Sequence, residues 1–191
     1  PMAKMTLLAV LAHPDDESFG MGGTLALYAA RGVEVHLVCA TRGEVGEVTP
    51  ELLEGYESIA KLRESELRCA AGILGLTGVH FLDYRDSGMP GSPDNTHPQA
   101  LAAQPLDEVA AKVVRHIREL KPQIVLTFDP IGGYRHPDHI AIQRATVRAF
   151  EQAGNPDFAA DCLPVFAPER LFFHKMPNDL LKFAVKILPI F

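Results

Sequence analysis

Apolar residues along the chain fall into short runs that alternate with stretches of helical periodicity. The runs predict buried strands at Met5–Ala12, Val33–Ala40, Val79–Leu82 and Ile124–Phe128, with a further strand at Arg170–His174. Helical spacing of apolar residues occupies the intervals between them, at Thr24–Arg31, Pro50–Leu74, Leu106–Leu120 and Asp138–Ala153. This alternation predicts an α/β fold: a single Rossmann-like domain over residues 1–191, with a mostly parallel sheet and helices on both faces.

Glycine and proline mark the breaks between these elements. Gly20–Gly23 predicts a turn, and Gly32 and Gly75 are expected to end helices. Asp83–Pro105 contains two glycines and four prolines, which predicts a long irregular loop of the kind that usually carries function. The glycine cluster does not fit the dinucleotide pattern G-x-G-x-x-G, because Leu25 occupies the third glycine position, so no nicotinamide cofactor is expected.

Polar residues gather directly after the predicted strands. The segments that follow the first four strands are His13–Glu17, Thr41–Glu47, Asp83–Ser87 and Asp129–His139. In open parallel sheets, ligands bind outside the carboxyl ends of the strands, at the point where the strand order reverses. The sequence therefore predicts an active site at this edge of the sheet.

Composition narrows the class of protein. The chain has 191 residues and a formal net charge of −6, which argues against a nucleic-acid partner, since such proteins normally carry a basic face. The chain has three scattered cysteines, Cys39, Cys69 and Cys162, and they form no C-x-x-C motif. This pattern argues against a disulfide framework and against a thiolate zinc finger, and it favours a cytoplasmic location. The first apolar run has eight residues and is too short to cross a bilayer.

The last residues of the sequence are apolar. Leu180–Phe191 has an amphipathic pattern that includes Lys182 and Lys186, and we interpret it as a core helix in preference to a helix lying on a membrane. No closing element follows Leu188–Phe191, so we expect the natural chain to continue beyond Phe191.

Two segments combine imidazoles with carboxylates at strand ends, His13–Glu17 and His136–His139. A catalytic divalent metal takes three protein ligands, often two histidines and a carboxylate, and keeps one position open. Either segment alone also fits a His-Pro turn or an acidic helix N-terminus favoured by the helix dipole. Because both follow strands that are expected to be neighbours, the two together predict a metal site.

These segments resemble the signatures of a known family. Ala12–Glu17 and Gly132–His139, together with the loop Arg85–Met89, are similar to the LmbE-like, or PIG-L, zinc N-deacetylases, and the resemblance runs from about Leu7 to Phe150. Members of that family remove the acetyl group from N-acetylglucosaminyl compounds or cleave a related amide. The sequence looks most similar to the mycothiol branch, which comprises a biosynthetic deacetylase and an S-conjugate amidase.

The resemblance implies a metal centre and a base. It implies that each chain binds one zinc ion, with Fe²⁺ as an alternative, through the ligands His13, Asp16 and His139. Asp15 matches the general base of the family. The chemistry agrees, because a zinc ion lowers the pKa of its bound water to about 7 and a carboxylate beside it can accept the proton.

The resemblance also assigns residues around the scissile amide and the sugar. His136 is expected to assist at the oxyanion or the leaving group, Tyr134 to polarise the carbonyl, and Asp138 to orient an imidazole. Three further residues match positions that hold sugar hydroxyls: Arg63, Asp86 and Glu47.

Simpler roles stay open for some of these residues. Tyr134 also fits a hydrophobic lid, Arg63 a surface ion pair with a neighbouring glutamate, and Asp86 an ordinary Asp-Ser-Gly turn. The histidines outside the two segments have no partner motif and are expected to be structural: His36, His80, His97, His116 and His174.

The sequence thus predicts a hydrolase that releases acetate and a free amine from a small-molecule glycoside, an N-acetylglucosaminyl compound. Three alternatives remain: an amidase acting on a thiol S-conjugate, a non-catalytic sugar-binding protein, and a phosphoesterase, which would need ligands for two metals. A homo-oligomer is compatible with the sequence, and neither a membrane span nor a nucleic-acid partner is expected.

Overall fold

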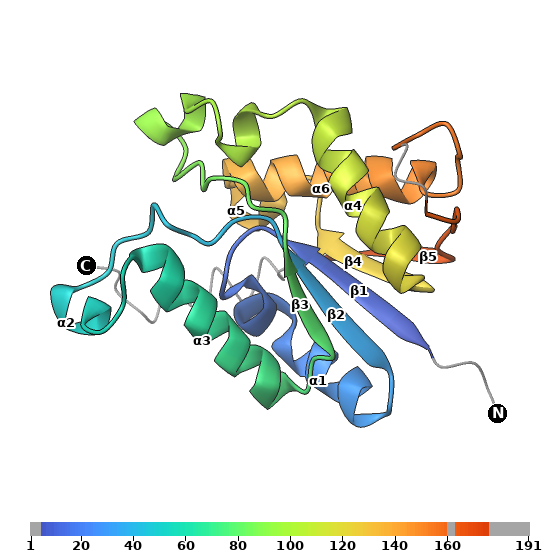
Figure 1. Ribbon diagram of the computed structural model, residues 1–191, viewed down its shortest axis with the longest axis horizontal. Coiled ribbons are helices and arrows are strands. Elements are labelled where there is room, and N and C mark those ends of the chain that lie inside the picture. The colour runs from blue at the N-terminus through green and yellow to red at the C-terminus, as the bar shows by residue number, and fades with distance from the viewer. Residues whose placement is uncertain (1–4, 160–162, 176–191) are drawn as a thin grey trace.

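A computed structural model of the chain describes residues 5–159 and 163–175 (Figure 1). These residues form one five-stranded sheet in which every neighbouring pair is parallel, in the order β3-β2-β1-β4-β5. The strands are β1 (Thr6–Leu11), β2 (Glu34–Cys39), β3 (Gly78–Phe81), β4 (Ile124–Phe128) and β5 (Arg170–His174). The predicted α/β fold with a parallel sheet is confirmed.

Helices cover both faces of the sheet, so the molecule has three layers (Figure 1). The longer helices are α1 (Gly22–Ala30) and α3 (Ile59–Leu74) on one face, and α4 (Leu106–Leu120) and α6 (Pro137–Gln152) on the other. The shorter elements are the π-helical turn Glu17–Met21, α2 (Pro50–Leu53), α5 (Gly132–Arg135) and two 3₁₀ turns, Pro93–Thr96 and Leu101–Ala103. The core between the layers consists mainly of leucine, valine, isoleucine and alanine side chains. Strand β1 lies at its centre and is buried along its whole length.

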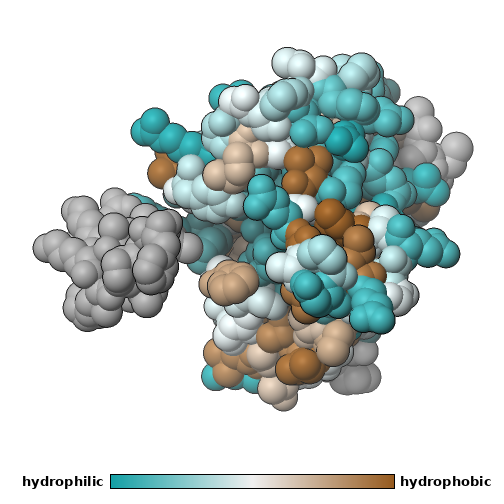
Figure 2. All heavy atoms as spheres, turned by 90° about the vertical axis from the view of Figure 1, so that its left-hand side faces the viewer, coloured by the Kyte–Doolittle hydropathy of each residue, from teal (hydrophilic) through white to brown (hydrophobic). Residues whose placement is uncertain are grey.

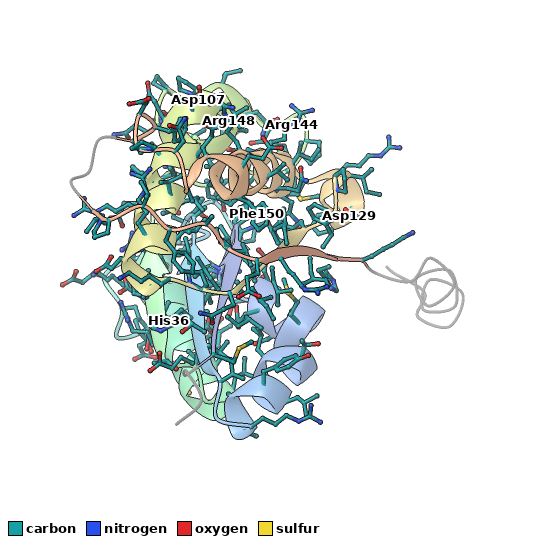
Figure 3. The ribbon with its side chains drawn as sticks, turned by 90° about the vertical axis from the view of Figure 1, so that its right-hand side faces the viewer. His36, Asp107, Asp129, Arg144, Arg148 and Phe150 are labelled. Carbon is teal, nitrogen blue, oxygen red and sulfur yellow. The ribbon has the colours of Figure 1, made fainter. Side chains whose placement is uncertain are left out.

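Helix α4 shows why its sequence pattern folds as it does. One face carries a buried apolar stripe that includes Val109, Val113 and Ile117, spaced by one helical turn. This face packs on the sheet and on α6, and Arg148 of α6 reaches Asp107 of α4, with 2.9 Å between Nε and Oδ1 (Figure 3).

The strand order reverses between β1 and β4. From β1 the chain builds outward through β2 and β3 on one side, while β4 and β5 lie on the other side. The register pairs Leu7 of β1 with Ile124 of β4, so the segments that follow Leu11 and Phe128 emerge side by side at the carboxyl edge. This is where a doubly wound sheet opens a ligand site.

Three local predictions were wrong. The pattern over Pro50–Leu74 predicts one helix, but α2 and α3 are separate because Gly55, with φ of +87°, turns the chain between them. Gly20–Gly23 lies in helical structure where a turn was predicted. The residues Asp129–Pro137, between the predicted strand and the predicted helix that starts at Asp138, have the composition of a loop, but they contain the short helix α5, built around Gly132 and Gly133, both with φ of +66°.

Among the residues that the structure describes, no helix combines the length and the hydropathy needed to cross a membrane. The amphipathic stretch Leu180–Phe191 and Cys162 lie outside the described residues.

Candidate metal centre

A cavity of about 390 Å³ opens at the carboxyl edge, between the segments that follow β1 and β4. Figure 2 views the molecule from this side, where hydrophilic and hydrophobic residues are interleaved. The cavity lining includes most of the residues singled out in the sequence: His13, Asp15, Glu47, Arg63, Asp86, Tyr134 and His136. The volume is sufficient for a small-molecule substrate.

The turn after β1 separates two adjacent carboxylates. Asp15 has φ of +103°, a backbone conformation that residues other than glycine rarely adopt. Its backbone N–H donates to Glu17 Oε2 over 3.0 Å. A π-helical turn, Glu17–Met21, follows directly. In this arrangement Asp16 contacts the buried histidines while Asp15 lines the cavity.

Three side chains form a triangle of potential metal ligands. His139 Nε2 lies 3.3 Å from His13 Nδ1 and 3.3 Å from Asp16 Oδ1, and His13 Nδ1 lies 3.7 Å from Asp16 Oδ2. Two nitrogen ligands bound about 2.0–2.1 Å from a tetrahedral ion are themselves about 3.3 Å apart. The structure therefore brings together the three residues that the sequence nominates as ligands, at separations that suit a metal ion.

The other nitrogen of His13 is held by carboxylates. His13 Nε2 lies 3.1 Å from Asp138 Oδ2 and 3.5 Å from Asp86 Oδ1. Asp138 is itself fixed by Ser87, whose backbone N–H donates to Oδ2 over 2.9 Å and whose hydroxyl donates to Oδ1. This network holds the His13 ring so that Nδ1 faces the triangle, as an outer hydrogen bond does for a metal-binding imidazole.

The electrostatics of the cluster favour a cation. Burial alone would lower the pKa of His13, but hydrogen bonds to Asp138 and Asp86 raise it to about 10. Burial raises the pKa of Asp16 to about 6, and burial together with the neighbouring His13 lowers the pKa of His139 to about 3. His139 is thus a neutral donor beside buried carboxylates, and this donor set fits a divalent metal ion.

Asp15 is bound by an arginine from the opposite wall. Arg63 Nη2 donates to Asp15 Oδ2 over 2.8 Å and to the Pro14 carbonyl over 2.6 Å, and Nη1 donates to the Gly43 carbonyl over 3.1 Å. Burial raises the pKa of Asp15 and the charge of Arg63 opposes that rise. The alternative role kept open for Arg63, a surface ion pair with a neighbouring glutamate, is therefore wrong. Its carboxylate partner in the structure is Asp15, the candidate base.

His136 and Tyr134 stand on the other side of the cluster. His136 Nδ1 accepts from the Asp138 backbone N–H over 3.2 Å, which leaves the ring proton on Nε2, and burial lowers the pKa of His136. Neutral His136 is therefore a donor through Nε2. Tyr134 is 57% exposed, its ring centroid lies 5.0 Å from that of His139, and burial near acidic side chains raises its pKa to about 12.

The three residues expected at the sugar occupy different depths. Glu47 is exposed at the rim of the cavity, and Arg63 is partly buried in its wall. Asp86 is buried, and its Oδ1 accepts from the Gly88 backbone N–H over 2.8 Å besides facing His13. Although burial raises the pKa of Asp86, the contact with His13 holds it well below its usual range.

Sequence reasoning missed two residues of this site. Buried Glu17 fixes the Asp15 turn, and buried Ser87 fixes Asp138. Both stand inside motifs that were quoted for other residues. The sequence signal that could have found them is their position: both are polar residues that follow shortly after a predicted strand, where polar side chains are expected to face the site.

Comparison with known proteins decides the family. The family model for GlcNAc-PI de-N-acetylase, PIG-L, matches residues 8–150. The chain belongs to the PIG-L family. The resemblance seen in the sequence is thereby confirmed.

Two curated relatives of this PIG-L chain carry related names. The 1D-myo-inositol 2-acetamido-2-deoxy-alpha-D-glucopyranoside deacetylase 1 of Catenulispora acidiphila is 42% identical over 98% of the chain and 61% of its own length. The deacetylase of the same substrate name from Acidothermus cellulolyticus is 49% identical over 77% of the chain and 53% of its own length. The chain thus spans between 53% and 61% of the length of these relatives.

A solved structure shares the fold of this PIG-L chain. The N,N'-diacetylchitobiose deacetylase of Pyrococcus horikoshii superposes with a TM-score of 0.72 at 26% identity, covering 96% of this chain and 68% of that one.

Proposed function

We propose that the chain carries the catalytic site of a metal-dependent N-deacetylase, which hydrolyses the N-acetyl amide of an N-acetylglucosaminyl compound. The observation that carries the proposal is the His13–Asp16–His139 triangle beside Asp15 at the cavity. The names of the curated relatives favour an inositol aglycone over the other candidates.

Zinc is the ion that best suits two imidazoles and a carboxylate, with Fe²⁺ as the alternative. His13, Asp16 and His139 would hold it, and Asp138 and Ser87 would orient His13. When bound, the ion lowers the pKa of water toward neutrality and polarises the amide carbonyl.

The protein's own residues then move the protons. Water attacks the carbonyl carbon, and Asp15 accepts the proton that this water loses. As the C–N bond breaks, Asp15 returns that proton to the leaving nitrogen, so the products are acetate and a free amine. Arg63 keeps the Asp15 carboxylate oriented toward the cavity through the 2.8 Å contact.

Two donors stabilise the developing charge on the carbonyl oxygen. His136 presents Nε2–H, because its Nδ1 accepts from the Asp138 backbone. Tyr134 presents a hydroxyl whose pKa of about 12 keeps it protonated over the working pH range. Glu47, Arg63 and Asp86 line the same cavity and are proposed to bind the sugar hydroxyls.

The test is release of primary amine by zinc-loaded protein from a panel of acylated compounds. The panel contains N-acetylglucosaminyl-inositol, N-acetylglucosaminyl-malate, N-acetylglucosamine, a chitobiose and a thiol S-conjugate. We expect zinc-dependent turnover of the inositol compound that falls at least about 100-fold in Asp15→Asn. Asp157→Asn, at an exposed position outside the cavity lining, serves as the matched control.

Other outcomes identify the alternatives. Turnover of the S-conjugate alone identifies the amidase. Binding of a panel member with equal affinity by wild type and Asp15→Asn, without amine release by either, identifies a sugar-binding protein. Two zinc ions lost together from variants of the triangle would favour the phosphoesterase.

A further inference from the structure

Part of the active-site cavity is lined by the loop that follows β3. Residues 86–92, here called the 86–92 loop, contribute four residues to the lining: Asp86, Gly88, Met89 and Ser92. The 86–92 loop forms no helix or strand, and Gly88 and Gly91 have φ of +68° and +88°. Its shape is therefore set by contacts outside regular secondary structure.

Two peptide N–H groups of this loop bind the carboxylates that hold His13. The Ser87 N–H donates to Asp138 Oδ2 over 2.9 Å, and the Gly88 N–H donates to Asp86 Oδ1 over 2.8 Å. Both carboxylates face His13 Nε2, at 3.1 Å for Asp138 and 3.5 Å for Asp86. The orientation of the His13 ring therefore depends on the position of one short stretch of backbone.

A single side chain that does not line the cavity holds the carbonyl groups of that backbone. Asn95 Nδ2 donates to the carbonyl oxygens of Ser87, Gly88 and Met89, over 2.5, 3.4 and 3.1 Å. Asn95 Oδ1 accepts from the Gly91 backbone N–H over 2.9 Å. A carboxamide suits this position because it offers two N–H donors and an acceptor at once, whereas a carboxylate offers acceptors alone.

The turn that carries Asn95 is itself anchored. Asn95 lies in the 3₁₀ turn Pro93–Thr96. Arg85 Nη2 donates to Asp94 Oδ1 in this turn over 2.6 Å, and the Arg85 backbone N–H donates to the Gln99 carbonyl over 3.0 Å. The turn is thus tied to the chain just before the 86–92 loop, and Asn95 supports the loop from a fixed position.

We propose that Asn95 is a positioning residue of the metal centre. It holds the backbone of residues 87 and 88, whose N–H groups fix the carboxylates of Asp138 and Asp86, and these carboxylates fix the ring of His13. Asn95 acts through the loop, and the same contact sets the cavity wall that the loop forms. The inference rests on the proposed function in taking the His13 cluster as a metal centre.

The first test measures the zinc affinity of the full chain by competition with a chromophoric chelator. Asn95→Asp keeps the shape and the acceptor for Gly91 but removes both N–H donors, so we expect the zinc Kd to rise about 10-fold. Asn95→Ala, which adds no charge, should change Kd in the same direction. Asn155→Asp is the matched control, because the Asn155 Nδ2 donates to the Gln152 side chain at the surface, over 3.0 Å.

Circular dichroism confirms that each of these variants is folded. An unchanged zinc Kd in folded Asn95→Asp, or an equal rise in Asn155→Asp, would overturn the proposal.

The second test reads the loop and its connection to Asp138. In Asn95→Asp the backbone amides of Ser87 and Gly88 should exchange hydrogen with solvent at least about 10-fold faster than in the wild type. In an Asp138→Asn background, the effect of Asn95→Asp on the zinc Kd should shrink to about 3-fold or less, because the two residues act along one path. Unchanged exchange, or full additivity of the two substitutions, would contradict the proposal.

Steady-state kinetics separates this inference from the proposed function. At saturating zinc, Asn95→Asp should raise KM about 10-fold, because the loop lines the cavity, and should leave kcat within about 3-fold, because Asp15 and Tyr134 are untouched. A lower kcat with unchanged KM would contradict the role of Asn95. If the wild type releases no amine from any panel member, the proposed function fails, and the zinc and exchange results still decide the role of Asn95.

Discussion

The guanidinium of Arg63 is bonded to the carboxylate of Asp15, with 2.8 Å between Nη2 and Oδ2, although the two residues are 48 positions apart in the chain. The same guanidinium also binds two backbone carbonyls, those of Pro14 and Gly43. Arg63 therefore fixes both the turn that carries the candidate base and the base itself. It acts as a positioning residue for Asp15 in addition to any contact with the sugar.

Replacing this arginine should alter the pH profile as well as the rate. In Arg63→Gln we expect kcat for amine release to fall roughly 10- to 100-fold, because the base is misplaced. The charge of Arg63 lowers the pKa of Asp15, so its loss raises that pKa and moves the acidic limb of the kcat profile to higher pH. Arg148→Gln, which removes an exposed ion pair with Asp107, is the control. A lower rate with an unshifted limb would limit Arg63 to substrate binding.

Gly43 should be needed for the same contact. A Cβ at this position would lie 2.0 Å from Arg63 Nη1, and φ of +63° already disfavours other residues. We expect Gly43→Ala to lower kcat in the same direction as Arg63→Gln. Gly23→Ala is the matched control, since a Cβ there meets nothing within 4 Å and α1 gains a better helix former. Equal activity of the two alanine variants would separate Gly43 from the function of Arg63.

Asp138 should control metal affinity without binding the metal. It holds His13 Nε2 over 3.1 Å and is fixed by Ser87. Removing the charge in Asp138→Asn should weaken zinc binding at the triangle roughly 10- to 100-fold, as measured by competition with a chromophoric chelator. Asp107→Asn, on the surface, should leave the zinc Kd unchanged. An unchanged Kd in folded Asp138→Asn would show that His13 needs no orienting carboxylate.

The strands were predictable because each is a short run rich in apolar residues, and the structure moves their ends by at most one residue. Burial on both faces is complete only in β1, while β3 is half-buried and β5 is partly exposed. The convergence of His13, Asp16, His136 and His139 followed from the strand-end rule. The pattern over Pro50–Leu74 misled because apolar spacing continues through Gly55, whose left-handed backbone no periodicity reveals.

Contacts between distant elements could not be derived from the sequence. The Arg63–Asp15 pair depends on the unusual φ of Asp15 and on the close approach to Gly43. His36 of β2 lies against His80 of β3, and His80 lies against His116 of α4; the register that sets His36 opposite Gly78 makes His80 its neighbour. Such pairings arise from tertiary packing, which local patterns do not encode.

Acid should destabilise the metal-free fold through His116. Its pKa is lowered to about 4 by burial and by the facing His80, with Arg115 in the same direction and Glu119 opposing. A histidine in the unfolded chain titrates near pH 6.5. Between pH 6.5 and pH 4 the unfolded state therefore binds more protons than the folded state, so the free energy of unfolding decreases as the pH is lowered. With EDTA present, His116→Gln should lose roughly 2–4 °C less in Tm between pH 7 and 5 than wild type. His97→Gln, on the loop after β3, should follow the wild type, and identical slopes for all three would refute this assignment.

Tyr134→Phe separates a donor from a lid. The tyrosine ring packs against His139, with 5.0 Å between centroids, and the hydroxyl has a pKa raised to about 12. If the hydroxyl donates to the carbonyl oxygen, kcat should fall about 100-fold in Tyr134→Phe, with little change in KM. A lid needs only the ring, so retention of kcat would assign that role. Tyr56→Phe, whose hydroxyl donates to Ser65 Oγ over 3.3 Å at the surface, controls for the loss of a phenol oxygen. Because a pKa of about 12 keeps the phenol protonated below pH 10, any alkaline limb near pH 8 should be unchanged in Tyr134→Phe.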